Sequence, residues 1–196
     1  ALQMRHGLSV LAEVGGRLGH ARDAAWARRQ RRRLDAILQK HCWDGQWFVR
    51  GFTDRGEVLG SRRNAEAKIY HPIQSFAVMY GAATPEQGRA AMDAVERLLE
   101  TPYGCMALTP PVAKAPCKEL RMVLMCPGEK ENAGIFSHSQ GWIVIANCML
   151  GNGDRAYRVH RANLPARFND LAELRRIEPY AYCQTTSSRH SPREGM

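Results

Sequence analysis

The stretch Ser139-Gln-Gly-Trp-Ile-Val-Ile-Ala-Asn-Cys-Met-Leu150, followed by Gly151-Asn152-Gly153, decides the fold class of this chain. Apolar residues occupy nearly all sides of a helix drawn over this segment, which is typical of a buried helix. A glycine directly after the last apolar residue is a common C-terminal cap. We therefore predict a buried helix at 139–150. Asp154 can cap a further helix that ends near Pro165.

Helical periodicity extends over much of the remaining chain. A first helix is predicted with one apolar face, made by Leu8, Leu11 and Leu18. Gly15-Gly16 weakens the prediction for its second half. A second helix is predicted over residues 21–41, with an apolar stripe at Leu34, Ile37, Leu38 and His41. Thr84-Pro85-Glu86-Gln87 has the pattern of a capping box, and the helix behind it has a stripe at Met92, Val95 and Leu99.

The segments between these helices predict hairpins and loops. Residues 43–52 are rich in aromatic and β-branched residues, and Asp54-Arg55-Gly56 follows them, which indicates a short hairpin. The prolines and glycine of residues 102–126 indicate a long connecting loop. The predicted fold class is therefore all-α, with one or two small β-hairpins. The alternation of amphipathic and apolar helices suits a double-layered helical barrel.

Length and composition exclude several classes of protein. The chain has 196 residues, 44% of them hydrophobic and 24% charged, which fits one globular domain or a large piece of one. The best apolar run, 142–146, is far too short for a membrane-spanning helix. No secretion signal is recognisable, and the six cysteines include no C-x-x-C pair. We expect reduced thiols, a cytoplasmic location, no metal site and no membrane partner.

The net charge of +9 raises the question of nucleic acid, because 28 Lys and Arg stand against 19 Asp and Glu. The densest basic run, Arg28–Arg33, lies inside helical sequence and precedes the apolar stripe. We predict that it is a solvated helix face. No nucleic-acid-binding motif is recognisable, and an enzyme that binds phosphate or anionic sugars would also tolerate a positive field.

The segment Pro127-Gly-Glu-Lys-Glu-Asn-Ala-Gly-Ile-Phe-Ser-His138 carries the most informative polar residues. Lys130 and Glu131 stand together in a Pro/Gly turn, and His138 lies where the buried helix starts. A helix N-terminus attracts phosphate through its unpaired N–H groups, and a histidine there adds a further donor. The alternative from spacing alone is a surface ion pair of Lys130 with Glu131 and a helix-capping His138.

Two further segments mix polar and aromatic residues. Glu178-Pro-Tyr-Ala-Tyr-Cys-Gln184 combines a carboxylate, two aromatic rings and an amide, which suits sugar binding. We expect Tyr180 and Tyr182 to be core residues, with a sugar platform as the alternative. Residues 64–70, Asn-Ala-Glu-Ala-Lys-Ile-Tyr, precede a second apolar helix that starts near Pro72, in the same polar-then-buried order as the His138 segment.

These segments together resemble the inverting disaccharide phosphorylases of glycoside hydrolase family ninety-four, which include the cellobiose, cellobionic acid and chitobiose phosphorylases. The resemblance covers essentially the whole chain. The motifs that carry it are Trp43-Asp-Gly-x-Trp-Phe48, Leu59-Gly-Ser61, Asn64-x-Glu66-x-Lys-Ile69, Gln74-Ser-Phe-Ala-Val78, Leu108-Thr-Pro-Pro111, Pro127-Gly-x-Lys-Glu-Asn-Ala-Gly-Ile-Phe-Ser-His138, Leu150-Gly-Asn-Gly-Asp-Arg-Ala156 and Glu178-Pro-Tyr-x-Tyr-Cys-Gln184. The Lys-Glu-Asn-to-His block is highly specific.

The resemblance implies a fold, a reaction and site residues. The fold is an (α/α)6 barrel with its site at one end of the inner helices. Phosphate attacks the anomeric carbon with inversion, and one carboxylic acid protonates the leaving oxygen. By position, His138 binds phosphate, Lys130 and Glu131 line the sugar sites, and Gln184 contacts the substrate. No cofactor is implied, because phosphate is a substrate, and the parent enzyme is expected to be a homodimer.

Two departures limit what the resemblance implies for this chain. The catalytic aspartate of the family lies in a Gly-Asp-Trp-Asn-Asp motif, and this sequence contains no such motif. A Thr-Gly phosphate loop expected after Ser191 is also missing. We therefore expect residues 1–196 to be a partial catalytic domain, truncated at both ends, without a catalytic residue. Phe76 stands where many relatives have Trp, which is a mild change.

The sequence leaves alternatives open for the substrate and for the class of function. Arg121 lies in the loop that varies with the leaving sugar, and it would pair with a carboxylate on a gluconate-type acceptor, or be an exposed loop residue. The sequence does not choose among cellobiose, cellobionic acid and chitobiose. A non-catalytic carbohydrate-binding or scaffold module is the alternative to an enzyme. The joint presence of Lys130, Glu131 and His138 favours the enzyme.

Overall fold

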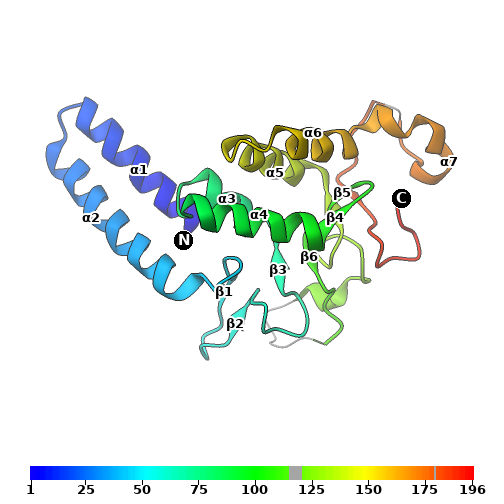
Figure 1. The fold of residues 1–196 in the computed structure, drawn as a ribbon, viewed down its shortest axis with the longest axis horizontal. Helices are drawn as coiled ribbons and strands as arrows, with labels where there is room; N and C mark the ends of the chain where they lie inside the picture. Colours follow the sequence, from blue (N-terminus) through cyan, green and yellow to red (C-terminus); the bar gives the residue numbers. More distant parts are fainter. Residues whose placement is uncertain (115–120, 179) are drawn as a thin grey trace.

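The computed structural model describes residues 1–114, 121–178 and 180–196, and helices dominate it (Figure 1). The α-helices are α1 (Leu2–Arg17), α2 (Ala21–Ile37), α3 (His71–Met79), α4 (Pro85–Leu99), α5 (Ser137–Met149), α6 (Gly153–Ala162) and α7 (Ala172–Arg175). A π-helical turn, η1 (Leu38–Cys42), extends α2, and η2 (Arg121–Leu124) and η3 (Pro165–Leu171) are 3-10 helices. This helix-rich fold confirms the predicted class in outline. None of the described helices has the length and apolarity needed to cross a membrane.

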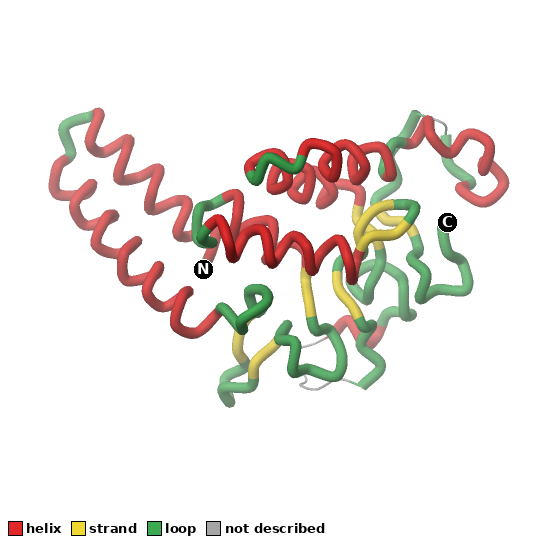
Figure 2. The backbone as a smooth tube through the Cα atoms, in the orientation of Figure 1, coloured by secondary structure: helices red, strands yellow, loops and turns green. Residues whose placement is uncertain are grey.

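The described strands are two residues long and pair antiparallel (Figure 2). Two pairs are hairpins, β1 (Gly51–Phe52) with β2 (Val58–Leu59) and β4 (Glu100–Thr101) with β5 (Gly104–Cys105). The first contains the predicted turn at residues 54–56. Two further pairs join distant segments and were not predicted: β3 (Ile69–Tyr70) with β6 (Leu108–Thr109), and β7 (Ile135–Phe136) with β8 (Thr185–Thr186). The expected loop at 102–126 thus contains β5, β6 and η2, and its residues 115–120 lie outside the described part.

The core lies between α3, α4, α5 and α6. The predicted stripe of α4 is fully buried: Met92, Val95 and Leu99 are each 0–1% exposed, and Ile143 of α5 packs in the same cluster. The capping box is confirmed, because Thr84 Oγ1 accepts from the Gln87 N–H at 3.2 Å and Gln87 Oε1 accepts from the Thr84 N–H at 3.0 Å. Burial of these side chains fixes the position of α5 against α3 and α4.

The predicted helix at 139–150 is α5, which begins two residues earlier. Gly151 follows it with φ +79°, so the predicted glycine C-cap is confirmed. The helix is not buried on every face, since Ile145 and Met149 are 47% and 58% exposed. Asp154 is not the cap of α6 either. The N-cap is Asn152, and Asp154 lies in the first turn, where its charge favours the helix dipole.

The helical hairpin of α1 and α2 extends away from the body of the molecule (Figure 1). Its predicted apolar faces are wrong in part: Leu11, Leu18 and Ile37 are 42%, 67% and 53% exposed, and His41 is exposed as well. The two helices pack instead through small residues, because Ala24 and Ala27 are buried and a Cβ on Gly15 would lie 3.4 Å from the Ala24 Cβ. Gly15, which weakened the prediction, is thus a packing residue.

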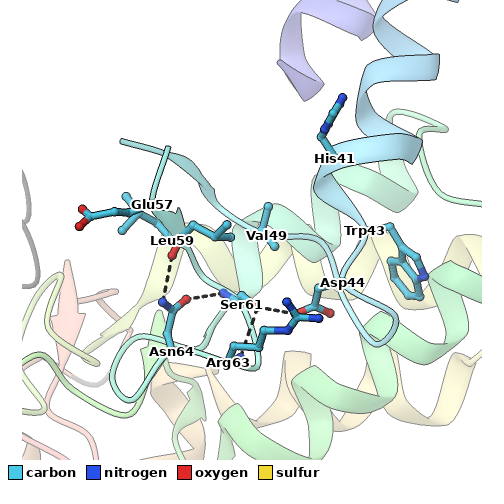
Figure 3. Close-up of a pocket in the computed structure, with 10 residues that line it drawn as sticks. His41, Trp43, Asp44, Val49, Glu57, Leu59, Ser61, Arg63 and Asn64 are labelled. Carbon is cyan, nitrogen blue, oxygen red and sulfur yellow. Dashed lines mark hydrogen bonds between the residues drawn. The ribbon is translucent and has the colours of Figure 1, made fainter. Parts of the chain in front are cut away.

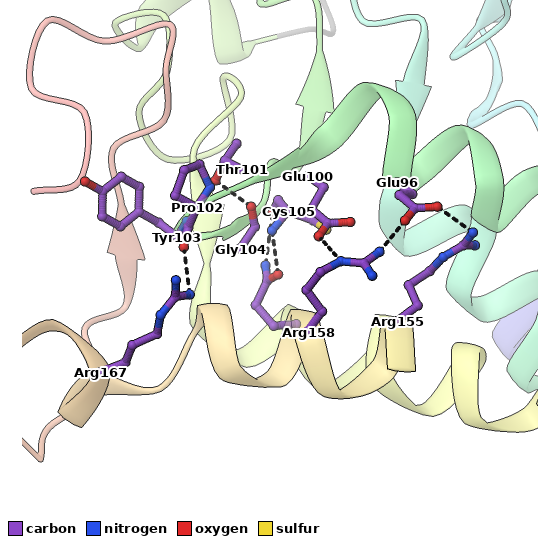
Figure 4. A network of polar contacts seen from close by, with 11 residues as sticks. Glu96, Glu100, Thr101, Pro102, Tyr103, Gly104, Cys105, Arg155, Arg158 and Arg167 are labelled. Atoms are coloured by element: carbon purple, nitrogen blue, oxygen red, sulfur yellow. Dashed lines mark hydrogen bonds and ion pairs between the residues drawn. The ribbon is translucent and has the colours of Figure 1, made fainter. Parts of the chain in front are cut away.

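Arginines of α6 pair with carboxylates of α4 and of the first residue of β4 at the surface of the core (Figure 4). Arg155 Nη2 lies 2.8 Å from Asp93 Oδ1 and 2.5 Å from Glu96 Oε2. Arg158 bonds to Glu96 and, at 2.8 Å, to Glu100 Oε1. Beneath this network, burial and then the neighbouring carboxylates raise the pKa of the Cys105 thiol. The network therefore holds α6 on α4 and leaves Cys105 a neutral core residue.

Candidate active site

A cavity of about 390 Å³ lies where the N-termini of α3 and α5 come together. Strand β3 leads directly into α3 and β7 leads directly into α5, so both helices present their first turns to this cavity. Three residues selected from the sequence line it: Glu131, His138 and Gln184. Arg50, Tyr70, His71 and Trp142 line it too and were not selected.

His138 is the second residue of α5 and does not cap it. The N-cap is Phe136, which has no side-chain capping bond, and the N–H of Ser137 donates to the Gln184 carbonyl, so the N–H groups of His138 and Ser139 are the ones in the first turn of α5 left for an acceptor. The His138 ring packs edge-on against Phe136 and Trp142, with ring centroids 5.4 Å and 5.5 Å apart. The ring remains exposed at the cavity. A helix N-terminus with an adjacent imidazole has the chemistry of an anion site.

Gln184 reaches the cavity because β8 pairs with β7. Phe136 stands opposite Thr185 in this pair, and Ser137 N donates to Gln184 O at 3.2 Å. The preceding tyrosines behave differently from the expectation. Tyr180 and Tyr182 are 83% and 56% exposed, so the prediction of core positions is wrong.

Lys130 and Glu131 point to different cavities. Glu131 lines the α3/α5 cavity, while Lys130 lines a smaller one of about 170 Å³, together with Arg193. No ion pair joins the two among the described residues. The turn is tight, because Lys130 has φ +46° and a Cβ on Gly134 would lie 2.5 Å from the Lys130 N and O atoms. Arg121 begins η2, but its side chain lies outside the described part of the structure.

His71, the first residue of α3, is fully buried in the wall of the cavity. Its Nε2 lies 3.0 Å from Ser139 Oγ of α5. Burial, and then the nearby His138, lower the pKa of His71 to about 3, so the ring is uncharged at neutral pH. A signal for His71 was present in the sequence, since it starts an apolar helix in the same layout as His138. Arg50 carries no such local signal; its guanidinium lies 4.6 Å from the centroid of the Tyr70 ring.

A second large cavity, of about 520 Å³, lies beside the first hairpin (Figure 3). Asp44, Ser61 and Asn64 in its lining are hydrogen-bonded within the protein. Asp44 Oδ1 accepts from the Gln46 and Trp47 N–H groups, both at 3.1 Å. Asp44 Oδ2 accepts from Ser61 Oγ at 3.1 Å and from the Arg62 N–H at 2.8 Å. These bonds give the Trp43–Phe48 motif a structural role.

The polar residues at 64–70 are also bonded to backbone. Asn64 Oδ1 accepts from the Ser61 N–H at 2.7 Å, and its Nδ2 donates to Val58 O at 2.9 Å. Glu66 Oε2 accepts from two backbone N–H groups, both at 3.1 Å. The basic run is a solvated face of α2, as predicted: Arg28, Arg29, Arg32 and Arg33 are exposed.

Comparison with known proteins identifies the family of the chain. The sequence profile of the glycosyl hydrolase 94 superfamily, catalytic domain, matches residues 3–196. The chain belongs to this superfamily. Among its relatives, the N,N'-diacetylchitobiose phosphorylase of Vibrio proteolyticus is 38% identical over 74% of the chain and 18% of its own length. The cellobionic acid phosphorylase of Neurospora crassa is 33% identical over 81% of the chain and 20% of its own length.

A third relative matches over the whole chain. The solabiose phosphorylase of Paenibacillus borealis is 29% identical over 100% of the chain and 26% of its own length. The chain therefore spans only about a fifth to a quarter of the length of these three relatives.

Proposed function

We propose that the full-length protein is an inverting disaccharide phosphorylase and that the α3/α5 cavity is part of its active site. The observation that carries this proposal is the meeting of Glu131, His138 and Gln184, from two separate segments of the chain, around one cavity at the N-terminus of α5. The phosphorylase relatives support the same reaction class.

The residues selected from the sequence have separate roles in the proposed reaction. His138 and the first N–H groups of α5 hold inorganic phosphate. Glu131 and Gln184 hydrogen-bond sugar hydroxyls, and Lys130 lines the sugar sites from the adjoining turn. We assign Arg121 to recognition of the leaving sugar, where it would pair with a carboxylate on an acidic acceptor. The substrate is a β-linked disaccharide of the chitobiose, cellobionic acid or cellobiose type.

The reaction needs one acid and no added base. A phosphate oxygen forms a bond to the anomeric carbon from the face opposite the leaving group, the glycosidic C–O bond breaks, and a carboxylic acid gives its proton to the departing oxygen. The products are an α-sugar 1-phosphate and the free second sugar. We place the acid in a segment outside residues 1–196, and we place α3–α6 within an (α/α)6 barrel. A homodimer and a cytoplasmic location complete the proposal.

The experiment is a phosphorolysis assay of the full-length protein. Chitobiose, cellobionic acid, solabiose and cellobiose are each incubated with and without inorganic phosphate. We expect phosphate-dependent release of a sugar 1-phosphate from one of them, and no release by residues 1–196 alone. Hydrolysis that does not require phosphate would contradict the proposal. Binding without turnover by the full-length protein would favour the carbohydrate-binding module.

A further inference from the structure

His71 connects the two helix N-termini that form the cavity. It belongs to the first turn of α3, and its Nε2 contacts Ser139 Oγ in the first turn of α5 at 3.0 Å. Ser139 Oγ in turn donates to Phe136 O at 2.9 Å. Both His71 and Ser139 are buried, at 0% and 2% exposure. This chain of contacts crosses from one helix to the N-cap residue of the other.

The direction of the hydrogen bonds follows from proton count. A serine hydroxyl has one proton, and Ser139 donates it to Phe136 O, so the proton between Ser139 and His71 belongs to His71 Nε2. His71 is therefore the donor. Its other ring nitrogen, Nδ1, has no hydrogen-bond partner in the described structure. Hydrogen bonding by the His71 side chain thus passes through Nε2, and the ring also packs against Trp142, with ring centroids 6.5 Å apart.

Phe136, the residue at the end of this chain of contacts, forms part of the surroundings of His138. Phe136 packs against the His138 ring, and its carbonyl also accepts from Gln140 Nε2 at 3.0 Å. A shift of the Phe136–Ser139 turn would move the His138 imidazole relative to the first N–H groups of α5. Positioning errors of this kind weaken binding of an anion that needs several donors at once.

We propose that His71 is a positioning residue, an uncharged hydrogen-bond donor that sets the orientation of His138 through Ser139 and Phe136. This positioning role rests on the proposed function only in that the bound anion is phosphate. Because the ring is uncharged, His71 acts by its hydrogen bond and adds no positive charge beside His138.

Two matched substitutions of His71 test the proposal. His71→Gln places an amide Nε2 donor near the position of the imidazole Nε2, while His71→Asn has the same chemistry but is one methylene shorter and does not reach Ser139. In the full-length protein we expect His71→Asn to raise the KM for phosphate about three- to tenfold, with little change in the KM for the disaccharide. His71→Gln should restore most of the difference. Ser139→Ala, which breaks the contact from the other side, should reproduce the effect of His71→Asn.

A binding measurement keeps the test independent of turnover. The shift of the unfolding midpoint on addition of inorganic phosphate is measured for each variant. We expect a smaller shift for His71→Asn and Ser139→Ala than for the wild type and His71→Gln. Equal phosphate responses in all four proteins would overturn the positioning role, as would equal losses for Asn and Gln. Phosphate-dependent stabilisation of a wild type that cleaves no disaccharide would contradict the proposed function but leave the role of His71 testable.

Discussion

The side-chain amide of Gln140 hydrogen-bonds to the backbone of Cys105 through both its oxygen and its nitrogen. Gln140 Oε1 accepts from the Cys105 N–H at 2.7 Å, and Gln140 Nε2 donates to Cys105 O at 3.0 Å. Two other buried amides make the same paired contact, Gln74 with Phe48 and Asn132 with Val112. Each side chain acts as a neighbouring strand would: Gln140 joins α5 to β5, Gln74 joins α3 to the segment before β1, and Asn132 joins the turn before β7 to the segment after β6.

Removal of the Gln140 amide should destabilise the protein. Gln140→Leu leaves the N–H and C=O of Cys105 buried without partners, and we expect the free energy of unfolding to fall by about 2–4 kcal/mol. Chemical denaturation measures this change. Gln46→Leu, at an exposed position, is the matched control and should be neutral. Similar losses for the two variants would show that the paired contact is not the cause.

Loss of the His138 imidazole should affect phosphate more than sugar. In the full-length protein we expect His138→Ala to lower the catalytic efficiency for phosphate about ten- to a hundredfold, because a charge-assisted donor at the anion is lost. Glu131→Gln is the matched comparison and should raise the KM for the disaccharide instead. Steady-state kinetics with each substrate varied in turn separates the two. Unchanged phosphate kinetics in His138→Ala would contradict the assignment.

Burial of His71 should make the folded protein sensitive to mild acid. Its pKa is about 3 in the folded state against an ordinary value of 6.5, so between these values the unfolded chain binds the extra proton. Titration of His71 therefore does not change the free energy of unfolding above about pH 6.5. As the pH falls from there towards 3, the free energy of unfolding decreases by at most about 1.4 kcal/mol per pH unit.

The measurement compares the wild type with His71→Gln, which cannot titrate in this range. We expect the free energy of unfolding to fall less steeply between pH 7 and pH 5 in the variant. The comparison is needed because His190 has a pKa lowered by burial and by Arg189, which contributes with the same sign in both proteins. Parallel pH profiles would contradict a neutral, buried His71.

The cysteines should separate into reactive and protected thiols. Cys126 and Cys148 are exposed, whereas Cys105 is buried and its raised pKa keeps it protonated. Alkylation of the native protein at pH 8, followed by peptide mapping, should label Cys126 and Cys148 and leave Cys105 unmodified until the protein is unfolded. Rapid labelling of native Cys105 would show that the α4/α6 surface opens.

Local signals in the sequence predicted most helices, and distant pairing explains what they missed. The capping box at Thr84 and the glycine after α5 act within a few residues, so they could be read directly. The exposure of Leu18 and Ile37 could not be read from the sequence, because burial depends on which element packs against a helix. His138 and Gln184 meet only through the β7–β8 pair, and Arg50 reaches the cavity only through the fold of the first hairpin.

The three amide contacts also change what backbone exchange with deuterium would report in this protein. The N–H groups of Phe48, Cys105 and Val112 are bonded to side chains that lie 26, 35 and 20 residues away in the sequence. Slow exchange at these amides does not indicate a local helix or strand. It indicates that Gln74, Gln140 and Asn132 are docked, so these three protons act as probes of whether the walls of the cavity are assembled.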